Sequence, residues 1–191
     1  MELQKLNVKL FAEQPNTVPL TDFIEIFHGW IQATDGIYHD VADYSHMDAG
    51  PGVVLVANDA NLSIDESDNR RGLLYSRKSA LVGSNQEKLR AVVRYGLENF
   101  RKLEREPKLG GRFKLLGDEA VIAINDRLAA PNTEESFAAV APEIEAVAKH
   151  LFADAEISLE RAPDRRRKFA VHIKASRSFS AEELLDRLQQ T

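Results

Sequence analysis

The sequence predicts a single α+β domain, residues 1–191, in which a mixed but mainly antiparallel sheet packs against about four helices. A length of 191 residues with 43% hydrophobic and 29% charged residues suits one packed domain. Short runs of alternating apolar and polar residues, separated by turn residues, indicate hairpins rather than parallel strands joined by helices. Longer stretches carry apolar residues at helical spacing, which indicates helices that cover the sheet.

The N-terminal half predicts a strand, a helix and a meander of short strands. Leu6, Val8 and Leu10 alternate with polar residues, as in a strand with one buried face. From Leu20 to Ile31 apolar residues recur at helical spacing, in a stretch that contains the only Trp of the chain. The strands of the meander are expected at residues 37–44, 53–57, 62–65 and 73–75.

Three further helices are predicted by their capping residues. Ser84 and Glu87 form a capping box at the start of one, and Ser180 begins the last. Asn132 or Thr133 caps the helix between them, which we expect Pro142 to interrupt because proline removes a helical hydrogen bond. The remaining strands are expected at residues 113–116 and 120–124, hinged at Gly117-Asp118, and at 156–160 and 169–175.

Charge and composition exclude several classes of protein. A net charge of -5 repels a polyanion, and the one basic run, Arg165 to Lys168, lacks the interleaved aromatic residues that stack on bases. We therefore expect no nucleic-acid partner. The chain has no cysteine, which excludes thiolate nucleophiles, disulfides and cysteine-based metal sites. No secretory signal and no long apolar run is present, so we expect a cytoplasmic protein with no membrane partner.

The segment from His39 to Gly52 holds the densest group of potential ligands. Asp43, Tyr44 and His46 are candidate binding residues, and His39, Asp43 and His46 are candidate ligands for a divalent metal ion that positions a water as nucleophile. The competing interpretation is a polar strand end that collects such residues for solubility and turn formation.

The strand predicted at residues 37–44 limits which of these side chains meet. His39, Val41 and Asp43 would share one face, whereas Tyr38 and Tyr44 would lie on the other. His46 joins His39 and Asp43 only if the chain bends near Ser45. No metal motif of known spacing supports the site.

A second polar stretch, Asn125-Asp126-Arg127, ends an apolar strand shortly before a helix start. Helix starts attract anions, and Arg127 offers a fork of donors to a carboxylate or phosphate, so Asn125, Asp126 and Arg127 are candidate binding residues. An ordinary ion pair made by Asp126 is the alternative. Phosphate-binding glycine loops and the nucleophile-elbow motif are absent, and no cofactor follows from the sequence.

Three strings, Asp40 to Tyr44, Gly50 to Val53 and Asn125 to Thr133, give the chain a resemblance to a bacterial family known mainly as uncharacterised sequences. The resemblance covers most of the chain and implies neither an activity nor a functional residue.

Three hypotheses about function remain. The first is a domain that binds a small-molecule ligand or another protein through the two polar stretches, and its rival is a metal-assisted hydrolase that uses His39, Asp43 and His46. The third is a homo-oligomer, in which Phe23, Phe27 and Trp30 pack against another copy.

Overall fold

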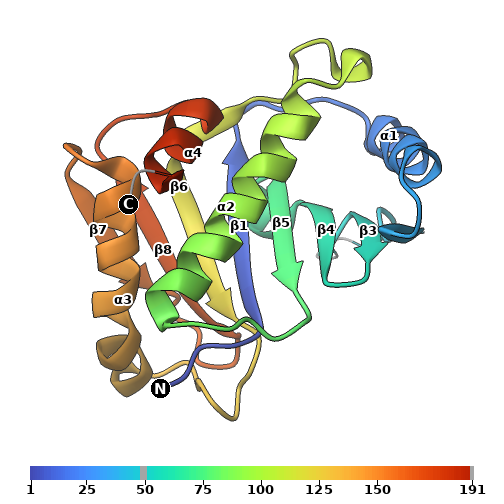
Figure 1. Ribbon diagram of the computed structural model, residues 1–191. Helices are drawn as coiled ribbons and strands as arrows, with labels where there is room; N and C mark the ends of the chain where they lie inside the picture. The colour runs from blue at the N-terminus through green and yellow to red at the C-terminus, as the bar shows by residue number, and fades with distance from the viewer. Residues whose placement is uncertain (48–50, 190–191) are drawn as a thin grey trace.

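A computed structural model describes residues 1–47 and 51–189 and confirms the α+β class. In these residues one eight-stranded, antiparallel sheet has the order β2-β3-β4-β5-β1-β6-β8-β7 (Figure 1). The strands are β1 (Leu6–Ala12), β2 (Tyr38–Asp43), β3 (Val53–Ala57), β4 (Ala60–Asp65), β5 (Gly72–Arg77), β6 (Leu115–Ile124), β7 (Ile157–Arg161) and β8 (Phe169–Ala175). The helices are α1 (Leu20–Ala33), α2 (Asn85–Glu104), α3 (Glu134–Phe152) and α4 (Ala181–Gln189).

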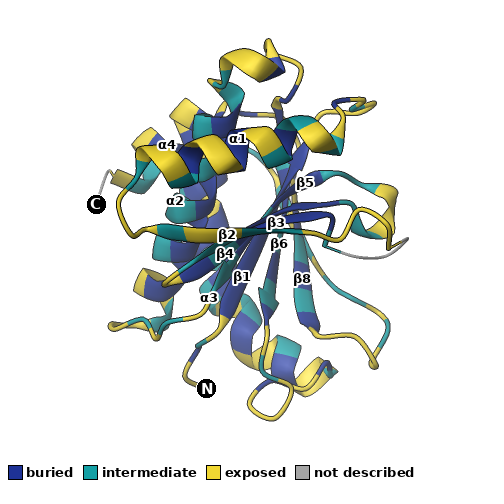
Figure 2. Cartoon of the chain, turned by 90° about the vertical axis from the view of Figure 1, so that its right-hand side faces the viewer, coloured by how far each residue is buried: buried dark blue, intermediate teal, exposed yellow. Residues whose placement is uncertain are grey.

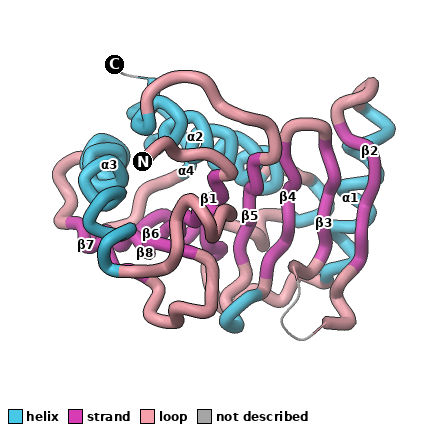
Figure 3. Tube along the Cα trace, turned by 90° about the horizontal axis from the view of Figure 1, so that it is seen from below, coloured by secondary structure: helices cyan, strands magenta, loops and turns pink. Residues whose placement is uncertain are grey.

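The sheet has one face covered by the α-helices and one on which none of α1 to α4 lies. Figure 3 shows α2, α3 and α4 on the same side of the strands. On β1, Leu6 and Val8 point to that side, while Asn7 and Lys9 point to the opposite side, which we call the open face. Figure 2 shows the buried positions concentrated on the inner strands and on the inner sides of the helices.

The helices form as their caps predict. Ser84 and Glu87 make a reciprocal capping box at α2, and Thr133 caps α3 by accepting a hydrogen bond from the Ser136 amide. Helix α1 buries Phe23, Phe27 and Trp30 within this chain, so the aromatic face proposed for contact with a second copy is already covered. No helix in the described part of the chain is long and apolar enough to cross a membrane.

Two expectations about local structure were wrong. The strands expected on either side of Gly117 form one strand, β6, because Gly117 adopts a φ of 79° and lets the chain continue with a change of register against β1. Helix α3 also continues through Pro142. Pro142 and Ala138, whose carbonyl loses its helical donor, are both exposed, so water can satisfy that carbonyl.

The sheet is strongly twisted. Strands β2 to β5 stand in a regular row in Figure 3, whereas β6, β8 and β7 are rotated relative to them. The twist brings loops from both ends of the sheet over the open face. Asn7 and Lys9 are only 6% and 8% exposed although none of the four α-helices lies on this face.

Candidate functional site

A cavity of about 750 Å³ lies on the open face. Its size falls within the range usual for small-molecule sites. It is lined by residues of β1 and β4 to β8 and of the loops at the sheet ends: Asn7, Pro51, Asp65, Ser67, Asp68, Leu74, Val121, Ala123, Arg127, Glu160, Arg161, Ala162, Pro163, Arg167, Lys168, Ala170 and His172. We call this space the open-face cavity.

The floor of the cavity is apolar and follows from the strand register. Ala123 on β6 pairs with Ala170 on β8, and Val121 pairs with His172 one step further along. Because alternate residues share a face, all four side chains point into the cavity side of the sheet. The small alanines leave the space that larger side chains would fill.

One polar side chain of the floor has no partner. Asn7 is 6% exposed, and its Oδ1 atom is buried with no hydrogen-bond donor among the described residues. Asn61 on β4 has the same defect, and both asparagines pair with Ser76 of β5, which lies between them. A buried acceptor without a donor is costly, so its presence in a cavity indicates that a ligand or water supplies the donor.

A buried ion pair shapes one wall. Lys9 Nζ lies 2.5 Å from Asp65 Oδ1, and the two side chains are 10% and 7% exposed. Asp65 also accepts hydrogen bonds from the amide and hydroxyl of Ser67, and Lys9 donates to the Ser67 carbonyl. These contacts hold the loop after β4 against the open face, where Ser67 and Asp68 line the cavity.

A charged cluster lies at the inner end of the cavity around Glu119. Its carboxylate accepts hydrogen bonds from Arg70 at 2.6 Å and Lys174 at 3.0 Å, and His172 Nε2 lies 3.1 Å from it. Burial alone would raise the pKa of Glu119, but the hydrogen bonds from Arg70 and Lys174 lower it below its ordinary value. The ionised Glu119 therefore holds Nε2 of His172, a residue that lines the cavity.

The loop between β7 and β8, residues 162–168, forms the opposite wall. Asn132 donates from its side-chain amide to the carbonyls of Ala162 and Asp164, which attaches this loop to the start of α3. Arg167 binds Asp68 through two hydrogen bonds of 3.1 Å. This ion pair joins the β7–β8 loop to the β4–β5 loop, so the two walls of the cavity are linked.

The residues predicted as metal ligands are not brought together. His39 lies 2.5 Å from the Asn58 side chain. Asp43 accepts hydrogen bonds from the side chain and the amide of Ser45, and these bonds, together with the nearby charge of His46, lower the pKa of Asp43. Tyr44 and His46 are exposed. No group of three or more metal-ligating side chains occurs within residues 1–47 and 51–189. Asp48 and Gly50, which belong to the same predicted segment, lie outside the described residues.

The alternation expected for this strand was also wrong. A register shift between Tyr38 and Asp40 places Tyr38 and Val41 on the same, helix-covered side, where both pack against the core. An extra residue in one strand reverses the side to which the preceding residues point. His39 lies at the shift.

The three residues of the second predicted stretch, Asn125-Asp126-Arg127, have different surroundings in the structure. Asp126 forms an ion pair with Lys5 at 3.0 Å and accepts hydrogen bonds from the amides of Leu128 and Ala129, so it stabilises a turn. The hydrogen bond from Lys5 is the main reason that the pKa of Asp126 is lowered. Asn125 is exposed, whereas Arg127 lines the open-face cavity. Pro51 of the first stretch lines the same cavity, so among the described residues Pro51 and Arg127 are the members of the two predicted stretches that line it.

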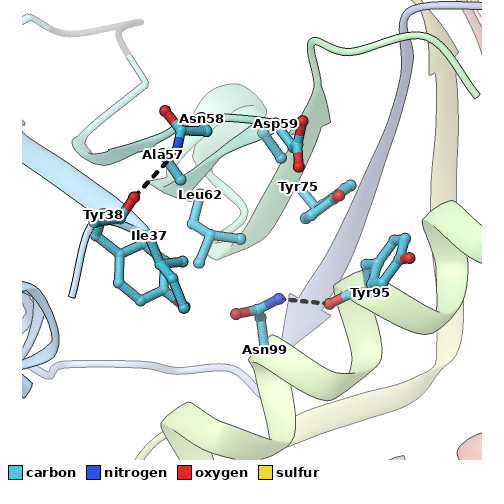
Figure 4. Close-up of a pocket in the computed structure, with 11 residues that line it drawn as sticks. Ile37, Tyr38, Ala57, Asn58, Asp59, Leu62, Tyr75, Tyr95 and Asn99 are labelled. Carbon is cyan, nitrogen blue, oxygen red and sulfur yellow. Dashed lines mark hydrogen bonds between the residues drawn. The ribbon is translucent and has the colours of Figure 1, made fainter. Parts of the chain in front are cut away.

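A second pocket, about 260 Å³, lies on the helix-covered side between Tyr38, Tyr75 and α2 (Figure 4). Burial raises the pKa of Tyr38 and of Tyr75, so both phenols are neutral. The chain itself supplies cations to the tyrosine rings: Arg94 lies 4.9 Å from the Tyr95 ring and Lys102 lies 5.3 Å from the Tyr38 ring. This pocket contains no buried polar atom without a partner among the described residues. We therefore take the open-face cavity as the candidate functional site.

Most residues of this site escaped the sequence-based prediction. Asn7, Lys9 and Glu119 occupy the polar positions of alternating strands, a pattern that is typical of a solvent-exposed face. The local signal that could have indicated them is their position inside strands whose neighbouring residues are strongly apolar. No family model, curated protein or solved structure matches the chain.

Proposed function

We propose that this protein binds a small organic molecule in the open-face cavity. The observation that carries the proposal is Asn7, which lines a cavity of about 750 Å³ and whose buried Oδ1 has no donor within residues 1–47 and 51–189. Such groups are uncommon in stable folds, and of the four that the described residues contain only this one belongs to a residue that lines the cavity. The apolar floor of Val121, Ala123 and Ala170 supplies the contact area that drives binding of an organic body.

A neutral fluorescent probe tests this proposal without assuming a charge on the ligand. We expect N-phenyl-1-naphthylamine to bind with a stoichiometry of one and to fluoresce more strongly when bound. Ala123→Trp fills the floor and should abolish binding, as should Ala170→Trp. Ala138→Trp, on the exposed side of α3, is the matched control and should bind like the parent protein.

Two results would contradict the proposal. The first is absence of saturable probe binding to the parent protein. The second is binding that survives in both folded floor variants but is lost in Tyr95→Ala, because this would place the probe in the tyrosine-lined pocket instead. Circular dichroism of each variant establishes that the protein is folded before binding is compared.

A further inference from the structure

The charges that line the open-face cavity are mostly paired with each other or with neighbours. Asp65 is neutralised by Lys9, Asp68 by Arg167 and Arg161 by Glu134. Among the lining residues this leaves two cations, Arg127 and Lys168, and one anion, Glu160, for which the described structure gives no ion pair or hydrogen bond. The unpaired charge of the cavity is therefore positive, in a chain whose net charge is -5.

The two unpaired cations lie at the same end of the cavity. Ile124, the last residue of β6, pairs with Phe169, the first residue of β8. Lys168 directly precedes that pair and Arg127 follows it by three residues, so the backbone places both at the end of the β6–β8 ladder. The third unpaired group, Glu160, lies on the edge strand β7. It is opposite His172 of β8, three residues along β8 from Phe169.

The apolar floor begins directly beside these cations. Ala123 and Ala170 form the next open-face pair inward, and Val121 and His172 follow. Asn7 pairs with Ala123 from the other side, so its unpartnered amide lies beside the first step of the floor. A molecule that enters the cavity thus meets positive charge at one end, an apolar surface along its body and a hydrogen-bond acceptor at its flank.

We propose that the ligand is an amphipathic organic anion, whose acidic group binds Arg127 and Lys168 and whose apolar body lies along Ala123, Ala170 and Val121. This inference rests on the proposed function, because it assigns a chemical class to the ligand of the same cavity. Arg127 supplies a planar fork of donors suited to a carboxylate, sulfonate or phosphate, and Lys168 adds a second charge. A hydrogen-bond donor on the body of the ligand would satisfy Asn7.

A pair of probes that differ in one group tests the class of ligand. The compound 5-anilino-1-naphthalenesulfonate has the same body and the same free N–H donor as N-phenyl-1-naphthylamine, with an added sulfonate on the second ring. We expect the sulfonate to bind at least about tenfold more tightly, and this advantage to disappear in Arg127→Gln/Lys168→Gln. Affinity for the neutral probe should be unchanged in that variant.

The matched control removes the same amount of charge from the β7–β8 loop, which also contains Lys168. Arg165→Gln/Arg166→Gln changes residues that do not line the cavity, and it should keep the advantage of the sulfonate. An equal loss in both double variants would mean long-range attraction rather than a binding site, and would overturn the assignment. Sodium sulfate at equal ionic strength should compete poorly, because it lacks the apolar body, and strong competition by it would contradict an amphipathic ligand.

The outcomes separate the two proposals. If the neutral probe binds in the cavity and the sulfonate binds no better, the cavity binds organic molecules but the anionic class is wrong. If neither probe binds to the parent protein, the proposed function itself fails.

Discussion

Asn7 occupies a position at which we expect a hydrophobic residue of similar size to make the protein more stable. Its buried Oδ1 has no donor among the described residues, and such a group costs about 1–3 kcal/mol. We predict that Asn7→Leu raises the free energy of unfolding by about 1–2 kcal/mol and weakens binding of both naphthalene probes. Urea unfolding and fluorescence titration measure the two effects on the same variant.

Asn61→Leu is the control for this prediction. Asn61 has an equally unpartnered Oδ1 on the same face but does not line the open-face cavity. This variant should also gain stability, yet its affinity for the probes should stay the same. A loss of stability in Asn7→Leu, or equal effects of both variants on binding, would contradict a ligand-directed role for Asn7.

Single residues differ in how far the sequence alone predicts their roles. The capping partners Ser84 and Glu87 are three positions apart, so a local pattern was sufficient to identify them. Lys9 and Asp65 are 56 positions apart, and their contact depends on the register of β1, β5 and β4. A buried lysine needs a partner of opposite charge, and a single sequence does not reveal which residue faces it.

At the scale of secondary structure elements, we predict opposite changes in the free energy of unfolding when two helical glycines are replaced by alanine. A Cβ atom on Gly96 of α2 would lie 2.7 Å from Val8 Cγ1, because the helix packs closely on β1. Gly29 is exposed on α1, and a Cβ there would meet nothing within 4 Å. We predict that Gly96→Ala lowers the free energy of unfolding by about 1–2 kcal/mol through overpacking. Gly29→Ala should raise it by about 0.5–1 kcal/mol through helix propensity.

Chemical denaturation of the two variants in parallel measures both effects, and each variant is the control for the other. Both changes add one methyl group to a helix interior, so propensity alone would stabilise both. If Gly96→Ala were as stable as Gly29→Ala, the close approach of α2 to β1 would be wrong.

The elements themselves were largely predictable, because alternation, helical spacing and capping residues are local features. The predictions failed where tertiary contacts decided the outcome. Gly117 continues β6 instead of ending a strand because its backbone pairs with Phe179: the Phe179 amide donates to the Gly117 carbonyl at 3.0 Å. A side chain at this position would collide with Phe179, because a Cβ atom on Gly117 would lie 2.0 Å from the Phe179 carbonyl oxygen.

At the scale of the whole molecule, the candidate site exists only through the order and twist of the sheet. Pro51 precedes β3, near one end of the strand order, and Glu160 lies on β7, at the other end, yet both line one cavity. The sequence indicated Arg127 as a binding residue but offered no means of placing it in one cavity with Lys168 and Asn7. Sheet order and twist follow from packing across the entire chain.

The same global arrangement predicts a role for the ion pair between Arg167 and Asp68, which links the β7–β8 loop to the β4–β5 loop across the cavity. The two side chains are 55% and 66% exposed, so the pair should contribute less than about 1 kcal/mol to global stability. Its effect should instead be local. We predict that Asp68→Ala accelerates amide hydrogen exchange several-fold in residues 162–168, with little change in the free energy of unfolding. In this loop the amides of Arg166 and Arg167 donate hydrogen bonds to Asp164.

Mass spectrometry of exchanged peptides checks this prediction, with Asp35→Ala, an exposed aspartate outside the cavity, as the control. The charge swap Asp68→Arg/Arg167→Asp should restore slow exchange, because the attraction between the loops is kept when the signs are reversed. High salt should mimic Asp68→Ala in the parent protein, since an exposed pair is screened. Unchanged exchange in Asp68→Ala would mean that the hydrogen bonds from Asn132 to Ala162 and Asp164 are sufficient to hold the loop over the cavity.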